Sequence, residues 1–194
     1  MIWTHELFGG AGRAKTLAYL FENSRQSFGV RELAQLTKVD PGNLSRWLKR
    51  WTDEGLLERT ASTATPRYAV AQGESLKPLV RFFQLQSSWA KGLQAQLQAL
   101  GDDVDAAAVF GSMAAGSATA DSDLDLLVLT DLPRVRAQAA FKAVARDLHK
   151  TINVLAYTRE HWEGMVQDGN PLALDILQHD VLPLKGDLHV AAQA

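Results

Sequence analysis

One segment constrains the fold more than any other, because it joins two apolar runs through a turn of small residues. The run Asp105–Phe110 is short and apolar enough for a buried strand, and Gly111-Ser112 with an alanine-rich stretch follows it. The second run, residues 121–129, alternates acidic and apolar residues, so that Asp123 and Asp125 share one face of a strand. The segment therefore predicts a strand, a turn, a helix and a second strand in succession.

The two aspartates predict a cation site. Carboxylates held this close repel one another unless a divalent cation lies between them, and hard oxygen ligands suit Mg²⁺. Gly111 lets the backbone approach a ligand closely, while Ser112 and the amides that open the next helix can donate hydrogen bonds to phosphate oxygens. Gly111, Ser112, Asp123 and Asp125 together predict a site for a nucleoside triphosphate (NTP), which we expect to be ATP, and its Mg²⁺.

The pattern Val109-Phe-Gly-Ser-Met followed by Ser122-Asp-Leu-Asp-Leu resembles the polymerase β-type nucleotidyltransferase superfamily, in particular its minimal nucleotidyltransferases. The resemblance covers residues 101–190 and is strongest at the motif. It implies that the Gly-Ser turn holds the triphosphate and that the catalytic residues Asp123 and Asp125 bind Mg²⁺. Some minimal members are antitoxins that attach AMP to a HEPN-type toxin, and others modify small molecules such as aminoglycosides.

The run Thr151–Tyr157 departs from the superfamily pattern. Where the superfamily has a third carboxylate on a later strand, this chain has Asn153. A third carboxylate would act as a base and bind a second metal ion, and an asparagine cannot accept a proton at neutral pH. Two interpretations stay open: catalysis with one principal metal ion and another base, or nucleotide binding without efficient turnover. Asp121, just before the aspartate pair, is interpreted as a turn-capping residue in preference to a metal ligand.

The first seventy residues follow a different pattern. Helical periodicity covers residues 12–22 and 30–37, and turn residues follow. A basic helix is predicted over Asn43–Glu54, with apolar side chains on one face. Two strand-like runs, Leu56–Thr60 and Arg67–Val70, then predict a hairpin.

This order of elements resembles the winged helix-turn-helix DNA-binding domain. The resemblance implies that the basic helix lies in the major groove of double-stranded DNA and that the hairpin touches the backbone or the minor groove. The residues expected to contact DNA are Asn43, Ser45, Arg46, Lys49, Arg50, Arg59 and Arg67. The alternative is a small helical bundle whose basic residues form a solvated face.

Charge and periodicity divide the chain. Residues 1–100 carry 13 Lys and Arg against 8 Asp and Glu, a net charge of +5, whereas residues 101–194 carry 7 against 14, a net charge of −7. Opposite signs favour two modules with different partners. An apolar stripe from Ser75 to Leu100 predicts a connecting helix that packs within the chain or against a second copy in a homodimer.

We therefore expect an α+β protein with three parts. These are a winged helix-turn-helix (1–73), a long connecting helix (74–100) and a minimal nucleotidyltransferase domain with a mixed sheet and flanking helices (101–194). The chain has no cysteine, which excludes disulfides, thiolate metal sites and a cysteine nucleophile. The first residues lack a signal-peptide pattern and no run of about 18 apolar residues occurs, so we expect a cytoplasmic protein outside the membrane.

The leading functional hypothesis is a DNA-binding transcriptional regulator that carries a Mg²⁺-dependent, nucleotide-binding domain of the nucleotidyltransferase type. The alternative is an active enzyme that transfers a nucleoside monophosphate (NMP) from NTP to a toxin-like partner protein or a small molecule. In that alternative the winged helix serves as a docking or dimerisation module. A third hypothesis is a structural adaptor in which neither site functions.

Overall fold

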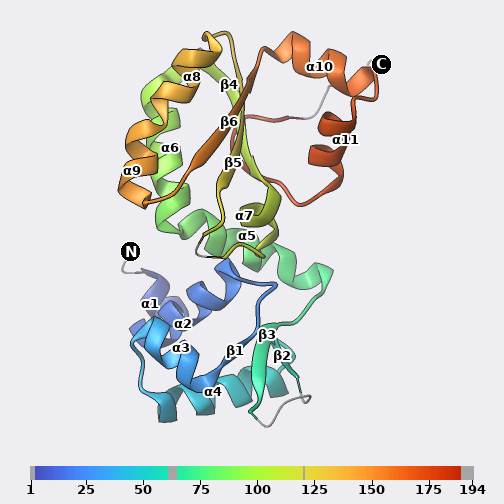
Figure 1. Ribbon diagram of the computed structural model, residues 1–194. Coiled ribbons are helices and arrows are strands. Elements are labelled where there is room, and N and C mark those ends of the chain that lie inside the picture. The colour runs from blue at the N-terminus through green and yellow to red at the C-terminus, as the bar shows by residue number, and fades with distance from the viewer. Residues whose placement is uncertain (1–2, 61–64, 120, 189–194) are drawn as a thin grey trace. The chain divides into compact units, whose positions relative to one another are not determined.

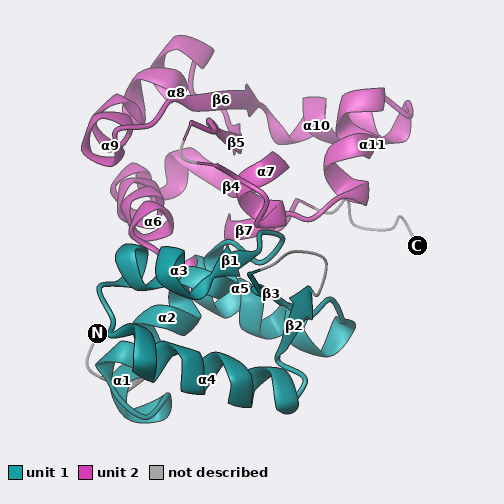
Figure 2. Cartoon of the chain, turned by 60° about the horizontal axis from the view of Figure 1, so that its bottom comes forward, with its two compact units in different colours: residues 1–84 teal, residues 85–194 magenta. Residues whose placement is uncertain are grey.

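The computed structural model describes residues 3–60, 65–119 and 121–188 (Figure 1). The chain divides into two compact units, residues 1–84 and residues 85–194, which are coloured separately in Figure 2. Each unit contains helices and strands, so the mixed α+β class is confirmed. The boundary between the units lies inside the stretch where a connecting helix was expected. Within the described ranges, no helix is both long and apolar enough to cross a membrane.

The first unit packs helices against a small antiparallel sheet. The helices are α1 (Trp3–Leu7), α2 (Ala11–Glu22), α3 (Val30–Thr37) and α4 (Pro41–Asp53). The strands are β1 (Phe28–Gly29), β2 (Leu57–Thr60) and β3 (Arg67–Val70), in the order β1-β3-β2. The core is formed by apolar side chains from α2, α3, α4 and the sheet, including Leu20, Phe21, Leu33, Leu44, Leu48 and Val70.

Helix α4 begins where a turn supplies its cap. The side chain of Asp40 accepts a hydrogen bond from the backbone N–H of Asn43 at 2.9 Å, and Pro41 opens the helix. Leu44 and Leu48, one turn apart, are completely buried. The helix is therefore anchored by its apolar face, and its polar and basic side chains are left in solvent.

The stretch in which one connecting helix was expected contains a 3₁₀ turn and two helices. They are η1 (Glu74–Leu76), α5 (Lys77–Gln86) and α6 (Ser88–Leu100). The break occurs at Ser87, whose hydroxyl accepts a hydrogen bond from the N–H of Ala90 at 3.2 Å and so caps α6. Phe83 packs in the core of the first unit and Trp89 in the core of the second. The apolar stripe is thus used within the chain, and the homodimer that it suggested stays a prediction.

The second unit is built on a four-stranded mixed sheet. Its strands are β4 (Val104–Phe110), β5 (Leu124–Thr130), β6 (Ile152–Tyr157) and β7 (Leu182–Lys185), in the order β6-β5-β4-β7. Strand β4 is antiparallel to β5 and β7, and β5 is parallel to β6. The carboxyl end of β4 therefore lies at the same end of the sheet as the starts of β5 and β6.

Helices cover both faces of this sheet (Figure 1). They are α6, α7 (Gly111–Ala115), α8 (Arg134–Ala140), α9 (Lys142–Leu148), α10 (Arg159–Gln167) and α11 (Pro171–Gln178). Leu124 and Leu126 of β5 share a core with α6 and α9, whereas Leu127 and Leu129 share a core with α10 and α11. Strand β5 is therefore buried on both faces, and its one acidic residue, Asp125, lies near its first end.

Gly186 marks a place where two backbone segments touch. It follows β7 with a φ of +58°, and a Cβ at this position would lie 2.3 Å from the carbonyl oxygen of Asp105. Any side chain at position 186 would therefore force the backbone apart, so this crossing requires glycine. The crossing holds the segment after β7 against the start of β4.

Candidate functional site

Gly111 brings a backbone turn directly against a carboxylate. It follows the last residue of β4, Phe110, which pairs with Asp125 of β5. Its φ is +68°, and a Cβ at Gly111 would lie 2.8 Å from Oδ2 of Asp125. The backbone conformation disfavours a side chain at this position, and an added Cβ would have to displace the carboxylate of Asp125.

The segment after Gly111 folds into one compact turn. The carbonyl oxygen of Ser112 accepts hydrogen bonds from the N–H groups of Ser117 and Ala118, at 3.0 and 3.1 Å. Gly116 ends α7 in the left-handed conformation, with a φ of 70°. The exposed backbone of Gly111 and the half-buried Ser112 thus lie on a constrained loop beside Asp125.

Asn153 brings the two predicted aspartates together. Asp125 is the second residue of β5 and lies opposite Asn153 of β6 in the parallel pairing. The side-chain nitrogen of Asn153 donates a hydrogen bond to Oδ1 of Asp125 at 3.0 Å and to Oδ2 of Asp123 at 3.5 Å. Asp123 and Asn153 are exposed and Asp125 is half-buried, so solvent reaches the carboxylates.

Lys150 supports the turn that carries Asp123, a role that sequence reasoning missed. Its ammonium group donates a hydrogen bond to the carbonyl oxygen of Ser122 at 3.0 Å. The hydroxyl of Ser122 in turn accepts from the N–H of Thr119 at 2.9 Å. In the sequence, Lys150 is only a lysine two residues before β6. Its contact with the carbonyl oxygen of Ser122 becomes evident only once β5 and β6 pair.

The donor atoms at this end of the sheet fit a hard divalent cation. Asp123 and Asp125 offer carboxylate oxygens, and the amide of Asn153 carries an oxygen beside the nitrogen that contacts them. Across the residues that the structure describes, no cluster of three or more His, Cys, Asp or Glu side chains could hold a metal. A cation bound by this set would keep positions for water or phosphate oxygens, which is how Mg²⁺ is held in many phosphate sites. The donor set therefore fits a hard divalent cation such as Mg²⁺ that takes its remaining ligands from elsewhere.

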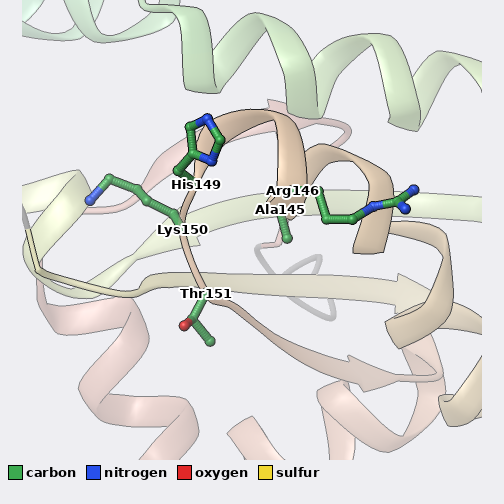
Figure 3. A pocket seen from close by; sticks show the side chains of 5 residues that line it. All are labelled: Ala145, Arg146, His149, Lys150 and Thr151. Carbon is green, nitrogen blue, oxygen red and sulfur yellow. The ribbon is translucent and has the colours of Figure 1, made fainter.

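A basic hollow lies where α9 leads into β6 (Figure 3). Its lining consists of Ala145, Arg146, His149, Lys150 and Thr151. The charged ends of Arg146 and Lys150 point in opposite directions in Figure 3. These cations therefore do not converge on one point, and the hollow has no focus for a single anion.

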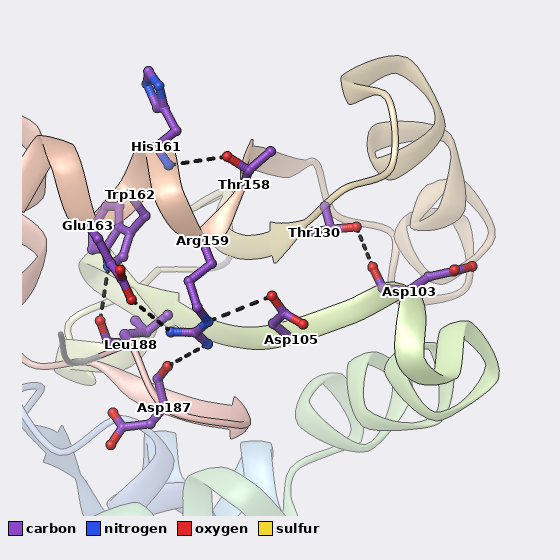
Figure 4. A network of polar contacts seen from close by, with 10 residues as sticks. All are labelled: Asp103, Asp105, Thr130, Thr158, Arg159, His161, Trp162, Glu163, Asp187 and Leu188. Atoms are coloured by element: carbon purple, nitrogen blue, oxygen red, sulfur yellow. Dashed lines mark hydrogen bonds and ion pairs between the residues drawn. The ribbon is translucent and has the colours of Figure 1, made fainter. Parts of the chain in front are cut away.

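Arg159 connects segments near the start of β4 (Figure 4). The small-residue turn follows the other end of that strand. Its guanidinium group lies 3.7 Å from the carboxylate of Asp105 and donates to the carbonyl oxygen of Asp187 at 3.2 Å. The indole N–H of Trp162 donates to the carbonyl oxygen of Leu188 at 3.0 Å. These contacts hold the segment after β7 in place and lie outside the candidate site.

In the first unit, the polar face of α4 carries most of the residues that were expected to contact DNA. The exposed ones are Ser45, Arg46, Lys49 and Arg50. Asn43 is half-buried, and its side-chain oxygen accepts a hydrogen bond from the guanidinium group of Arg46. The structure thus gathers these residues on one helix.

The two arginines of the hairpin have different surroundings. Arg59 is exposed on β2. Arg67 forms an ion pair with Glu32 at 3.1 Å and donates to the hydroxyl of Ser27 at 3.1 Å. Arg67 is therefore held by side chains of its own unit. Residues 61–64, at the expected tip of the hairpin, lie outside the described residues.

Comparison with known proteins concerns the second unit most directly. A family model described as "Nucleotidyltransferase domain" matches residues 91–165, the segment that carries Gly111, Ser112, both aspartates and Asn153. A solved mutant of the toxin–antitoxin MntA-HpeT aligns with 52% of this chain and 75% of that chain, at 14% identity and a TM-score of 0.39. A toxin–antitoxin structure with AMP-PNP aligns with 45% of this chain and 83% of that chain, at 16% identity and a TM-score of 0.33. None of the curated proteins matches the sequence significantly.

Proposed function

We propose that the second unit binds a nucleoside triphosphate together with Mg²⁺ and transfers its nucleotidyl group to an acceptor. The contact between Gly111 and Asp125 carries this proposal, because it joins a turn of backbone amides to a carboxylate that can hold a cation. The match of residues 91–165 to a nucleotidyltransferase domain supports it.

In this proposal the Gly-Ser turn and the two aspartates have different roles. Gly111 and Ser112 receive phosphate oxygens, and Asp123 and Asp125 hold Mg²⁺, which when bound offsets the negative charge of the phosphates. The hydroxyl oxygen of the acceptor forms a bond to the α-phosphorus, and the bond from that phosphorus to its bridging oxygen breaks. Pyrophosphate leaves with the electron pair, and the proton of the acceptor passes to solvent.

The acceptor that we propose is a hydroxyl group on a partner protein. The antitoxin members of the superfamily that the motif resembles favour this class of acceptor. The net charge of −7 over residues 101–194 also favours a partner with a basic surface. The enzyme hypothesis is therefore preferred to the regulator hypothesis for the second unit.

Calorimetric titration with Mg²⁺ and AMP-PNP tests the binding site. The Asp125→Asn variant keeps the shape of the side chain but removes the charge, so we expect the affinity to fall about 10-fold or more. Asp121→Asn is the matched control, because Asp121 is exposed and lies outside the aspartate–asparagine contact. Equal affinities of the wild type and Asp125→Asn would contradict the assignment.

Transfer is tested separately with ATP labelled at the α-phosphate. A candidate acceptor protein should gain the label and pyrophosphate should be released, and both signals should disappear in Asp125→Asn. Binding of AMP-PNP without label transfer or pyrophosphate release would favour nucleotide binding without turnover, the second interpretation of the Asn153 position.

A second candidate function, contact with double-stranded DNA, rests on the first unit. The specific observation is the basic face of α4, which is exposed beside a sheet in the order β1-β3-β2. This combination supports the winged helix-turn-helix interpretation. Fluorescence anisotropy with a labelled DNA duplex tests it, and an absence of binding at low salt would remove this candidate.

A further inference from the structure

The amide of Asn153 occupies the space between the two carboxylates of the candidate site. Its nitrogen lies 3.0 Å from Oδ1 of Asp125 and 3.5 Å from Oδ2 of Asp123. An asparagine amide has two N–H donors on one nitrogen, so a single group can serve both carboxylates. Asn153 thus connects two groups that would otherwise repel each other.

This arrangement holds the aspartates together without a cation. The partial positive charge of the amide N–H groups offsets part of the carboxylate repulsion, which a carboxylate at position 153 would increase. The parallel register of β5 and β6 places Asn153 directly opposite Asp125, so the contact is built into the sheet. The amide of Asn153 also hinders a cation from reaching the carboxylates, because its donor nitrogen faces the oxygens that would bind the cation.

We infer that Asn153 is a positioning residue that couples cation binding to nucleotide binding. With only two carboxylates and a neutral amide, the site holds a cation weakly when the nucleotide is absent. Phosphate oxygens supply the missing ligands, and a half-turn of the amide exchanges its nitrogen for its oxygen on the side of the carboxylates. The cation and the triphosphate therefore bind together, and each strengthens the binding of the other. This inference rests on the proposed function.

Mn²⁺ titration of the full chain by calorimetry, with and without AMP-PNP, tests the coupling. In the wild type we expect AMP-PNP to raise the Mn²⁺ affinity about 10-fold or more. Asn153→Asp replaces the donor by a third carboxylate, so we expect Mn²⁺ alone to bind about 10-fold or more tightly than in the wild type. The effect of AMP-PNP on the Mn²⁺ affinity should shrink accordingly in this variant.

The matched control is Asn170→Asp, which adds the same charge at a different place. Asn170 caps α11 by accepting a hydrogen bond from the N–H of Leu172, and aspartate caps helices equally well. This variant should bind Mn²⁺ as the wild type does. Circular dichroism checks that both variants fold, and thermal unfolding should show Asn153→Asp less stable without cation and restored by Mn²⁺.

The outcomes separate this inference from the proposed function. Equal Mn²⁺ affinities of the wild type and Asn153→Asp without nucleotide would overturn the inference. A wild type whose Mn²⁺ affinity is unchanged by AMP-PNP would overturn it as well. In both cases the proposed function stands if AMP-PNP binds the wild type about 10-fold or more tightly than it binds Asp125→Asn. If AMP-PNP does not bind the wild type at all, the proposed function fails and the inference fails with it.

Discussion

At the scale of single residues, Gly111 determines how closely the turn can approach Asp125. Two independent restrictions act on this position. Its φ is +68°, and a Cβ added to Gly111 would lie 2.8 Å from a carboxylate oxygen of Asp125. The first restriction concerns only the backbone of Gly111. The second also involves Asp125, because a larger residue at position 111 would displace its carboxylate. A substitution here therefore changes both the stability of the turn and the place of a proposed metal ligand.

We expect Gly111→Ala to weaken the binding of Mg²⁺ and AMP-PNP by about 10-fold or more, because the added methyl group displaces Asp125. The left-handed conformation should also cost about 1–2 kcal/mol of folding free energy. Urea denaturation measures the stability, and calorimetry measures the affinity.

Gly164→Ala is the control for this substitution. Gly164 lies in α10 with open space at its Cβ position, so alanine should be neutral or stabilise the helix by up to about 1 kcal/mol. Nucleotide affinity should not change in this variant. Wild-type affinity in Gly111→Ala would show that the turn tolerates a side chain and does not position Asp125.

At the scale of elements, the helices and strands with a strong local pattern could be predicted from the sequence. Helix α3 has the expected bounds, and α4 begins two residues before the expected start because Asp40 and Pro41 supply the cap and the first turn. Strands β4 and β6 differ from the expected runs by one residue, and β5 begins three residues later than expected. Alternation or helical spacing within one run carries this information.

Other elements could not be predicted, because their cause is not local. Strand β1 has two residues and exists through its pairing with β3. The break at Ser87 interrupts an apolar stripe whose periodicity continues on both sides, so only the serine cap marks it. In the site, the Gly-Ser turn and both aspartates are visible in the sequence. The contacts of Asn153 and Lys150 depend on the register of β5 and β6.

Helix α4 carries the prediction for the first unit. Lys49 is exposed on its basic face, so Lys49→Ala should weaken the binding of duplex DNA for all sequences. The slope of the logarithm of affinity against the logarithm of salt concentration should fall by about 0.9, as expected for one lost phosphate contact. Anisotropy titrations over a series of salt concentrations measure both effects.

Lys142 provides the comparison for this experiment. It is exposed at the start of α9 in the second unit, and its replacement by alanine removes the same charge. DNA affinity and salt slope should stay at wild-type values in Lys142→Ala. If both variants reduce the slope equally, the effect comes from total charge and not from α4.

At the scale of the whole molecule, each unit has its own hydrophobic core. The core of the first unit includes Phe83, and the second unit begins its own packing with Leu85 and Trp89. Helix α5 therefore contributes Phe83 to the core of the first unit and Leu85 to the core of the second, whereas α6 belongs to the second unit alone. Separate cores of this kind are the property that allows a part of a chain to fold alone.

We predict that a fragment of residues 85–194 folds cooperatively and binds Mg²⁺ and AMP-PNP as the full chain does. The fragment keeps the Ser87 cap and both cores that cover the sheet. Thermal unfolding followed by circular dichroism tests folding, and calorimetry tests binding. A folded fragment that does not bind, beside a full chain that binds, would show that the first unit contributes to the site.

The crossing at Gly186 has a consequence for the descent of this chain. Because a methyl group there would collide with the carbonyl oxygen of Asp105, mutation at this codon has almost no neutral outcome while the crossing persists. Residues before and after position 186 can be replaced over evolution, whereas Gly186 itself cannot while the two segments cross in this way. We therefore expect that, in homologues with any other amino acid at the position aligned with Gly186, the segment after β7 follows a different path. The residue at this position would then separate homologues that have the crossing from those that lack it.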